Sequence, residues 1–113
     1  MRFFKCFTQI FLVATLLVCS SCSKKNEIPD DIIPPKQMTE ILTEMHTIDA
    51  YFLVSTNYRY DSLQNEMFYS YQQLFKKYKI TDEDFVRSMD YYSSHEKEFH
   101  EIYENVVLNL NER

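Results

Sequence analysis

The sequence predicts an all-α protein, a small bundle of about four helices that follows a cleaved signal peptide and a short proline-containing tether. Two observations favour helices over a β-sheet. The chain of 113 residues has no glycine, so it lacks the Asn-Gly and Gly-X pairs that most β-hairpins need at their turns. Beyond residue 34, apolar side chains recur at the spacing of an amphipathic helix. The chain therefore divides into residues 1–21, 22–33 and 34–113.

Residues 1–21 predict a secretory signal peptide. Arg2 and Lys5 form a short positive segment, and a mainly apolar run follows from Cys6 to Val18, which is the plan of a signal peptide. The run is shorter than the roughly 20 apolar residues that span a bilayer. We therefore expect this segment to be removed, not to stay as an anchor.

Cys22 comes directly after the small residues Ser20 and Ser21, and this order resembles the lipobox of bacterial lipoproteins. The resemblance implies that cleavage follows Ser21 and that Cys22 carries a diacylglyceryl group and an N-acyl chain. Two or three acyl chains anchor a protein stably where one does not. Cys19 departs from the pattern, since a lipobox usually has an aliphatic residue there. The alternative is a plain cleaved signal with an incidental cysteine.

Residues 22–33 predict a tether. The stretch up to the Pro34–Pro35 pair is polar, holds the three prolines of the chain and shows no apolar period. A flexible chain of about a dozen residues spans roughly 20 Å. In some bacteria an acidic run after the lipidated cysteine directs export to the cell surface, but Lys24 and Lys25 stand there instead. This favours the periplasmic face of the envelope, with the domain held to the bilayer through Cys22.

Two apolar stripes predict the first two helices of residues 34–113. After the Pro34–Pro35 pair, the first stripe gives a helix to about Val54. The second gives a helix from about Asp61 to Tyr78. The stripes consist of Met38, Ile41, Leu42, Met45, Ile48 and Phe52, and of Leu63, Met67, Tyr71, Leu74, Phe75 and Tyr78.

Start signals place the third and fourth helices. Thr81 precedes three acidic residues, and a hydroxyl cap with acids in the first turn stabilises a helix N-terminus. Ser93 followed by Glu96 predicts a second capping box, at the start of the fourth helix. The apolar stripes of these helices are Phe85, Met89 and Tyr92, and Phe99, Ile102, Tyr103, Val106 and Leu110.

The charge and cysteine content of the mature chain exclude several classes of function. After the signal there are ten Lys and Arg against 17 acidic residues, a formal charge of −7. Such a domain has no electrostatic reason to bind nucleic acid or anionic lipid. Cys6 and Cys19 would leave with the signal, so an acylated Cys22 leaves no thiol for a disulfide, a metal site or a nucleophile.

The stretches IPPKQMTEILTEMHTIDA, YQQLFKKYKITDEDFVRSMDYY and FHEIYENVV resemble the bacterial lipoprotein family known as domain of unknown function 4296. The shared pattern is a Pro-initiated helix, a Lys-Tyr-x-Ile-Thr-x-x-x-Phe turn, a Ser-x-x-Tyr-Tyr element and a closing Ile-Tyr-x-x-Val helix. It covers Pro34 to about Leu110. Lys79 is a departure, because members often have a glycine helix cap there, and a lysine must adopt a strained left-handed conformation or end the helix differently. The resemblance implies a lipoprotein address and a helical fold, and no activity.

Candidate catalytic and metal-binding residues lack the required spacing. His95 and His100 in HEKEFH are five residues apart, about 140° around a helix, whereas the zinc motif H-E-x-x-H needs four. His46, three residues before Asp49, indicates a local hydrogen bond. Without glycine the chain has no G-x-S-x-G elbow and no phosphate-binding loop. We therefore expect no catalytic residue, metal or cofactor.

The sequence favours a non-catalytic module that binds an envelope protein or peptide. On a helical wheel, Tyr69 and Tyr91 point away from the apolar stripes of their helices, and tyrosine is enriched at protein interfaces. Tyr69, Tyr91 and Arg87 are therefore the hypothetical partner-binding residues. One alternative is a small periplasmic hydrolase or sugar-handling protein that uses surface aromatics and a carboxylate pair, such as Glu40 and Glu44. Another is a purely structural envelope protein.

Overall fold

The computed structural model describes residues 3, 27–55 and 60–113. Within these ranges it contains helices α2 (Pro35–Val54), α3 (Tyr60–Tyr78), α4 (Asp82–Ser93) and α5 (Glu96–Asn111), and no strand. The all-α prediction and the expected bundle of about four helices are confirmed. The predicted cleavage residue Ser21 and lipidation residue Cys22 lie outside the described residues.

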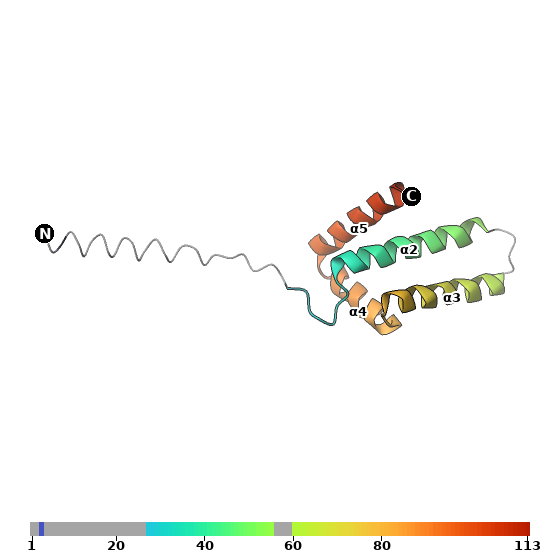
Figure 1. Cartoon of the computed structure of the whole chain (residues 1–113), viewed down its shortest axis with the longest axis horizontal. Coiled ribbons are helices and arrows are strands. Elements are labelled where there is room, and N and C mark those ends of the chain that lie inside the picture. The colour runs from blue at the N-terminus through green and yellow to red at the C-terminus, as the bar shows by residue number, and fades with distance from the viewer. Residues whose placement is uncertain (1–2, 4–26, 56–59) are drawn as a thin grey trace.

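Helix α2 is the central element of the bundle. It lies between α3 and α5, and the short helix α4 connects these two outer helices below it (Figure 1). Helices α2 and α3 form an antiparallel hairpin, whose closed end, where α2 stops and α3 begins, lies opposite the residues directly before α2 (Figure 1). Both helices extend beyond α5 at this end, so α5 covers only the first part of α2.

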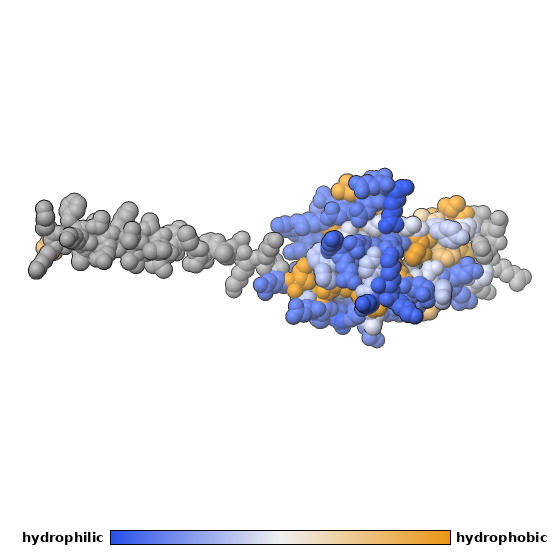
Figure 2. All heavy atoms as spheres, viewed as in Figure 1, coloured by the Kyte–Doolittle hydropathy of each residue, from blue (hydrophilic) through white to orange (hydrophobic). Residues whose placement is uncertain are grey.

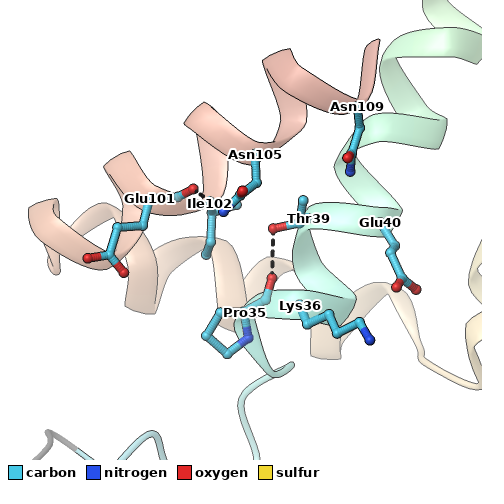
Figure 3. A pocket seen from close by; sticks show the side chains of 8 residues that line it. All are labelled: Pro35, Lys36, Thr39, Glu40, Glu101, Ile102, Asn105 and Asn109. Atoms are coloured by element: carbon cyan, nitrogen blue, oxygen red, sulfur yellow. Dashed lines mark hydrogen bonds between the residues drawn. The ribbon is translucent and has the colours of Figure 1, made fainter. Parts of the chain in front are cut away.

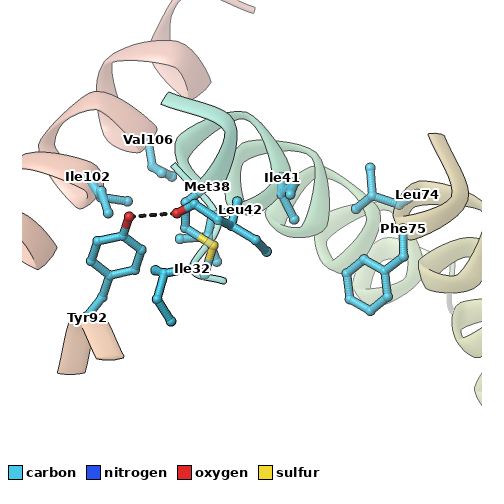
Figure 4. Close-up of a cluster of buried hydrophobic side chains, with 10 residues drawn as sticks. Ile32, Met38, Ile41, Leu42, Leu74, Phe75, Tyr92, Ile102 and Val106 are labelled. Carbon is cyan, nitrogen blue, oxygen red and sulfur yellow. Dashed lines mark hydrogen bonds between the residues drawn. The ribbon is translucent and has the colours of Figure 1, made fainter. Parts of the chain in front are cut away.

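The core consists of side chains from every helix, with those of α2 in the middle. Met38 and Ile41 of α2 are fully buried. On one side they face Leu74 and Phe75 of α3, and on the other the residues of α4 and α5 (Figure 4). Burying an aliphatic or aromatic side chain contributes roughly 1.5–3 kcal/mol, so the buried side chains of α2 stabilise the packing of α3 on one side and of α4 and α5 on the other. The buried core residues are Ile32, Ile33, Met38, Ile41, Leu42, Leu74, Phe75, Tyr92, Ile102 and Val106.

Start signals in the sequence agree with the structure for α2 and α4 but not for α5. Proline occupies the first position of α2, where its missing N–H costs nothing. Thr81 caps α4: its hydroxyl accepts the Asp84 N–H, and the Asp84 carboxylate accepts the Thr81 N–H. The capping box predicted from Ser93 is wrong. Ser93 is still the last residue of α4, and its hydroxyl donates to the Asp90 carbonyl, so α5 starts after His95 without a side-chain cap.

Residues 28–33, which we call the N-terminal strap, correct the predicted boundary at residue 34. Ile32 and Ile33 are buried in the core, and Ile28 packs against it. The strap is also held by polar contacts with α4. The Ile33 N–H donates to Ser88 Oγ at 2.9 Å, and its carbonyl accepts the Tyr92 hydroxyl at 2.7 Å. The strap therefore belongs to the folded domain, not to the tether.

Lys79 ends α3 in the left-handed conformation, with φ of 56°. The Ile80 N–H bonds to the Phe75 carbonyl and the Lys79 N–H to the Lys76 carbonyl. This is the Schellman arrangement, in which a left-handed residue satisfies the last carbonyls of a helix. The lysine thus adopts the strained alternative foreseen from the sequence, because the turn itself requires it.

Replacing Lys79 with glycine is expected to stabilise the domain. A side chain in the left-handed region costs roughly 1–2 kcal/mol, which glycine avoids. We expect Lys79→Gly to raise the free energy of unfolding by about 1 kcal/mol, measured by urea titration. The matched control is Lys76→Gly in the last turn of the same helix, which should lower it by up to about 1 kcal/mol. Equal signs for the two variants would contradict the role assigned to the turn.

Candidate functional site

The histidines lie apart and serve local contacts. His46 packs edge-on to the Tyr103 ring, and its Nδ1 lies 4.0 Å from Asp49 Oδ2. His95 stacks on the Tyr91 ring at 3.9 Å between centroids, and its Nδ1 lies 2.6 Å from the Tyr91 carbonyl oxygen. His100 is exposed and pairs with Glu104. In the part of the chain that the structure describes, no three His, Cys, Asp or Glu side chains gather where a metal could bind.

Two pairs of tyrosine and carboxylate connect α3 to α2. Tyr71 donates its hydroxyl to Asp49, and Tyr78 donates to Glu44, which also accepts from Lys77 at 2.7 Å. Burial and the bonded carboxylate raise the pKa of both tyrosines. Burial alone would raise the pKa of Glu44, but the Lys77 and Tyr78 donors outweigh it and lower that pKa. These groups hold the hairpin together, and neutral tyrosines of raised pKa are poor catalytic bases.

The proposed carboxylate pair does not face one cleft. Glu44 is occupied by Lys77 and Tyr78, while Glu40 lines a groove of about 440 Å³ between α2 and α5 (Figure 3). Glu40 and Glu101, the acids of this groove, are both exposed. Polar side chains that line this groove already form hydrogen bonds within the protein. Thr39 donates to the Pro35 carbonyl at 2.9 Å, and Asn105 to the Glu101 carbonyl at 2.8 Å.

A second groove, of about 740 Å³, lies at the closed end of the α2–α3 hairpin. We call it the hairpin-end groove. Its walls are mainly apolar, and Figure 2 shows hydrophobic surface at this end of the molecule, one of several hydrophobic patches on this face. Leu53, which lines the groove, is 83% exposed, and the neighbouring Val54 is 77% exposed. The lining residues are Asp49, Ala50, Phe52, Leu53, Ser55, Leu63, Gln64 and Met67.

Further apolar side chains are exposed on both helices of the hairpin. Tyr51 follows the groove residue Ala50 on α2, and Phe68 follows the groove residue Met67 on α3. Both side chains are well exposed, as is Tyr69. Single exposed apolar residues are ordinary, but a contiguous apolar surface usually marks an interaction site. Among the described surfaces, the hairpin-end groove is therefore the best candidate for binding.

The three partner-binding residues named from the sequence differ in their surroundings. Tyr69 lies on α3 with 65% of its surface exposed. Tyr91 is half-buried, since its ring packs against Tyr92 and stacks on His95. Arg87 pairs with Asp84 and Asp31 and donates to the Asp31 carbonyl, so it ties the N-terminal strap to α4. We find no contact that brings Tyr69 together with the other two in the described residues.

The sequence contains a pattern that indicates the hairpin-end groove, although the apolar stripe predicted for α2 does not reveal it. Residues 50–54, AYFLV, are five consecutive apolar residues. At 100° per residue they surround the whole helix, so one packed neighbour cannot cover them all. Because α5 does not reach this end of α2, the side chains that α3 leaves uncovered face outward. A run of this kind at the end of a predicted amphipathic helix indicates an exposed apolar surface.

Comparisons with known proteins identify a family but no characterised relative. The family model described as Domain of unknown function (DUF4296) matches residues 29–113. The match begins within the N-terminal strap, in agreement with the boundary that the packing indicates. No curated protein and no solved structure matches the chain. Among the described residues, no helix combines the length and apolar character needed to cross a bilayer.

Proposed function

Since the chain belongs to the family described as Domain of unknown function (DUF4296), we propose a function from its own surface: it is a lipid-anchored envelope protein that binds a protein or peptide partner without catalysing a reaction. The observation that carries the proposal is the exposed, mainly apolar hairpin-end groove. In the described residues, the titratable groups with shifted pKa values are engaged in structural hydrogen bonds or buried in the core.

The position of the groove fits presentation to a partner away from the bilayer. Chain length limits the distance from Cys22 to the first packed residue, Ile28, to about 22 Å. The N-terminal strap then leads directly into α2, whose 20 residues extend about 30 Å. The groove is lined by the last residues of α2, and this end of α2 lies opposite the strap (Figure 1). An acylated Cys22 would thus hold one end of the domain near the membrane and leave the groove free.

The anchor is tested by changing Cys22 to alanine. Without the thiol no thioether to diacylglycerol can form, so Cys22→Ala should fail to incorporate labelled fatty acid and should accumulate as uncleaved or soluble protein. Cys19→Ala is the matched control and should label and fractionate as wild type does. Labelled Cys22→Ala in the membrane fraction would refute lipidation at this residue.

The binding function is tested by photo-cross-linking in intact cells. A photo-reactive phenylalanine analogue in place of Leu53 should give a discrete adduct on irradiation, because this side chain lies exposed in the groove. The same analogue at Val107 is the control, since that residue is also exposed but lies on α5. Absence of any adduct from position 53 would refute the proposed function.

A further inference from the structure

The described lining of the hairpin-end groove offers no unpaired charge to a ligand. Asp49 is the one titratable residue in this lining, and its carboxylate accepts the Tyr71 hydroxyl and lies 4.0 Å from His46 Nδ1. The other lining residues are apolar, except for the uncharged Ser55 and Gln64. A charged ligand would lose its hydration here without gaining a partner of opposite charge. The groove therefore favours an apolar surface.

Exposed apolar side chains border the groove on both helices. Leu53 projects from the middle of the α2 wall, because at 100° per residue it lies between two other lining residues of this helix. Phe68 lies one turn beyond the lining residue Gln64 on α3, and 63% of its surface is exposed. With the exposed Val54, these side chains present roughly 400 Å² of apolar surface to solvent, since large apolar side chains have about 150–250 Å² each.

This area and shape fit an interface between two copies of the chain. With the partly buried walls of the groove, each copy offers roughly 500 Å², so a pair would bury about 1,000 Å², the least that a specific interface usually needs. A twofold axis brings the same face of both copies together. The groove has about 740 Å³ and the small Ala50 in its wall, so it has room for the Leu53 side chain of the other copy. Four helices would then enclose one apolar core, as in a four-helix bundle.

Two other occupants fit the structure less well. The bilayer is a poor occupant, because an acylated Cys22 holds the N-terminal strap near the membrane and the closed end of the hairpin lies opposite the strap (Figure 1). An unrelated protein would have to present an apolar surface at the height of the groove. Copies of this chain, held by identical tethers, do so without further requirement. Confinement to one membrane also raises their effective concentration, which compensates for the small area.

We infer that the hairpin-end groove binds the same groove of a second copy of this chain, with Leu53 of each copy in the groove of the other. The inference rests on the proposed function and names the partner. The exposed Leu53 and the hollow beside it are thus the two halves of one symmetric contact.

The test uses the full-length protein with the photo-reactive analogue at Leu53, in cells that also make a second, differently tagged copy. After irradiation, an adduct should carry both tags. After digestion, mass spectrometry should locate the link within residues 49–55 or 63–68 of the second copy. A link elsewhere in the second copy, or an adduct with another protein alone, would overturn the inference and leave the proposed binding function standing. A lipid adduct alone, or no adduct, would end both.

Adjacent substitutions on α3 supply a second readout. Phe68→Asp in both copies places a charge at the edge of an apolar interface, where no partner of opposite charge compensates its lost hydration. We expect it to reduce the two-tag adduct from position 53 about tenfold. Tyr69→Asp is the matched control. Tyr69 is as exposed as Phe68 but lies about 200° around the helix from the lining residue Met67, so the yield should not change.

Folding is checked by circular dichroism and urea unfolding, in which both variants should match the wild type because both side chains are exposed. An undiminished yield with Phe68→Asp would overturn the inference. So would an equal loss with Tyr69→Asp, since the contact would then not lie on the side of the groove.

Discussion

Ile33→Ala in the N-terminal strap is expected to lower the free energy of unfolding by about 3 kcal/mol, and a chain beginning at Pro34 is expected not to fold. Ile33 is only 5% exposed and lies in the core. Truncating a buried isoleucine to alanine costs 2–5 kcal/mol through lost burial and the cavity left behind. Urea unfolding followed by circular dichroism measures the effect.

Removal of the whole strap adds further losses. Ile32 leaves the core with Ile33, and the buried Tyr92 hydroxyl loses the carbonyl to which it donates. An unsatisfied buried hydroxyl costs about 1–3 kcal/mol. Together these losses approach the whole free energy of unfolding of a small domain, for which about 5 kcal/mol is the low end of the usual range. A chain that begins at Glu27 keeps the strap and should unfold cooperatively.

The exposed residue Asp30 provides the point-mutation control within the strap. Asp30→Ala should change the free energy of unfolding by less than about 0.5 kcal/mol. If the chain starting at Pro34 unfolds with the same midpoint as the one starting at Glu27, the strap is not part of the domain and the boundary expected from the sequence was right.

The sequence did not predict that the N-terminal strap belongs to the folded domain, because the burial of the strap has no local cause. Prolines and acids surround Ile32 and Ile33, and neither helical nor strand periodicity extends through such a segment. The hydrogen-bond partners of Ile33, Ser88 and Tyr92, are 55 and 59 residues away along the chain. The helices, in contrast, were predictable since their apolar stripes and the Thr81 cap act within a few residues.

The limits of local signals also explain the error at Ser93 and the incomplete view of the groove. Ser93 and Glu96 have the spacing of a capping box, but the chain continues as α4 through Ser93 and turns only at Ser94 and His95. Likewise, the apolar stripe predicted for α2 includes Phe52, but it does not reveal that α5 leaves this end of α2 uncovered. How far each helix is covered depends on the relative lengths of packed neighbours, which no single segment encodes.

Tyr92→Ala is expected to produce the largest single-residue loss, about 4 kcal/mol of unfolding free energy, because Tyr92 is fully buried beside Ile102 and Met38 (Figure 4). Burial raises the pKa of Tyr92 to about 12, so its hydroxyl stays protonated and donates to the strap at ordinary pH. Tyr92→Phe keeps the ring and removes this bond, so it should cost only about 1–2 kcal/mol.

The neighbouring Tyr91 is the matched control, since adjacent helical residues point about 100° apart. Tyr91 is half-buried against Tyr92 and His95, so Tyr91→Ala should cost about 1–2 kcal/mol. Urea unfolding should show the largest loss in free energy of unfolding for Tyr92→Ala. The losses for Tyr92→Phe and Tyr91→Ala should be smaller and close to each other. If Tyr91→Ala cost as much as Tyr92→Ala, both rings would be core, and Tyr91 would no longer be a candidate for partner binding. A small loss would leave Tyr91 available for partner binding beside Tyr69, which is more exposed.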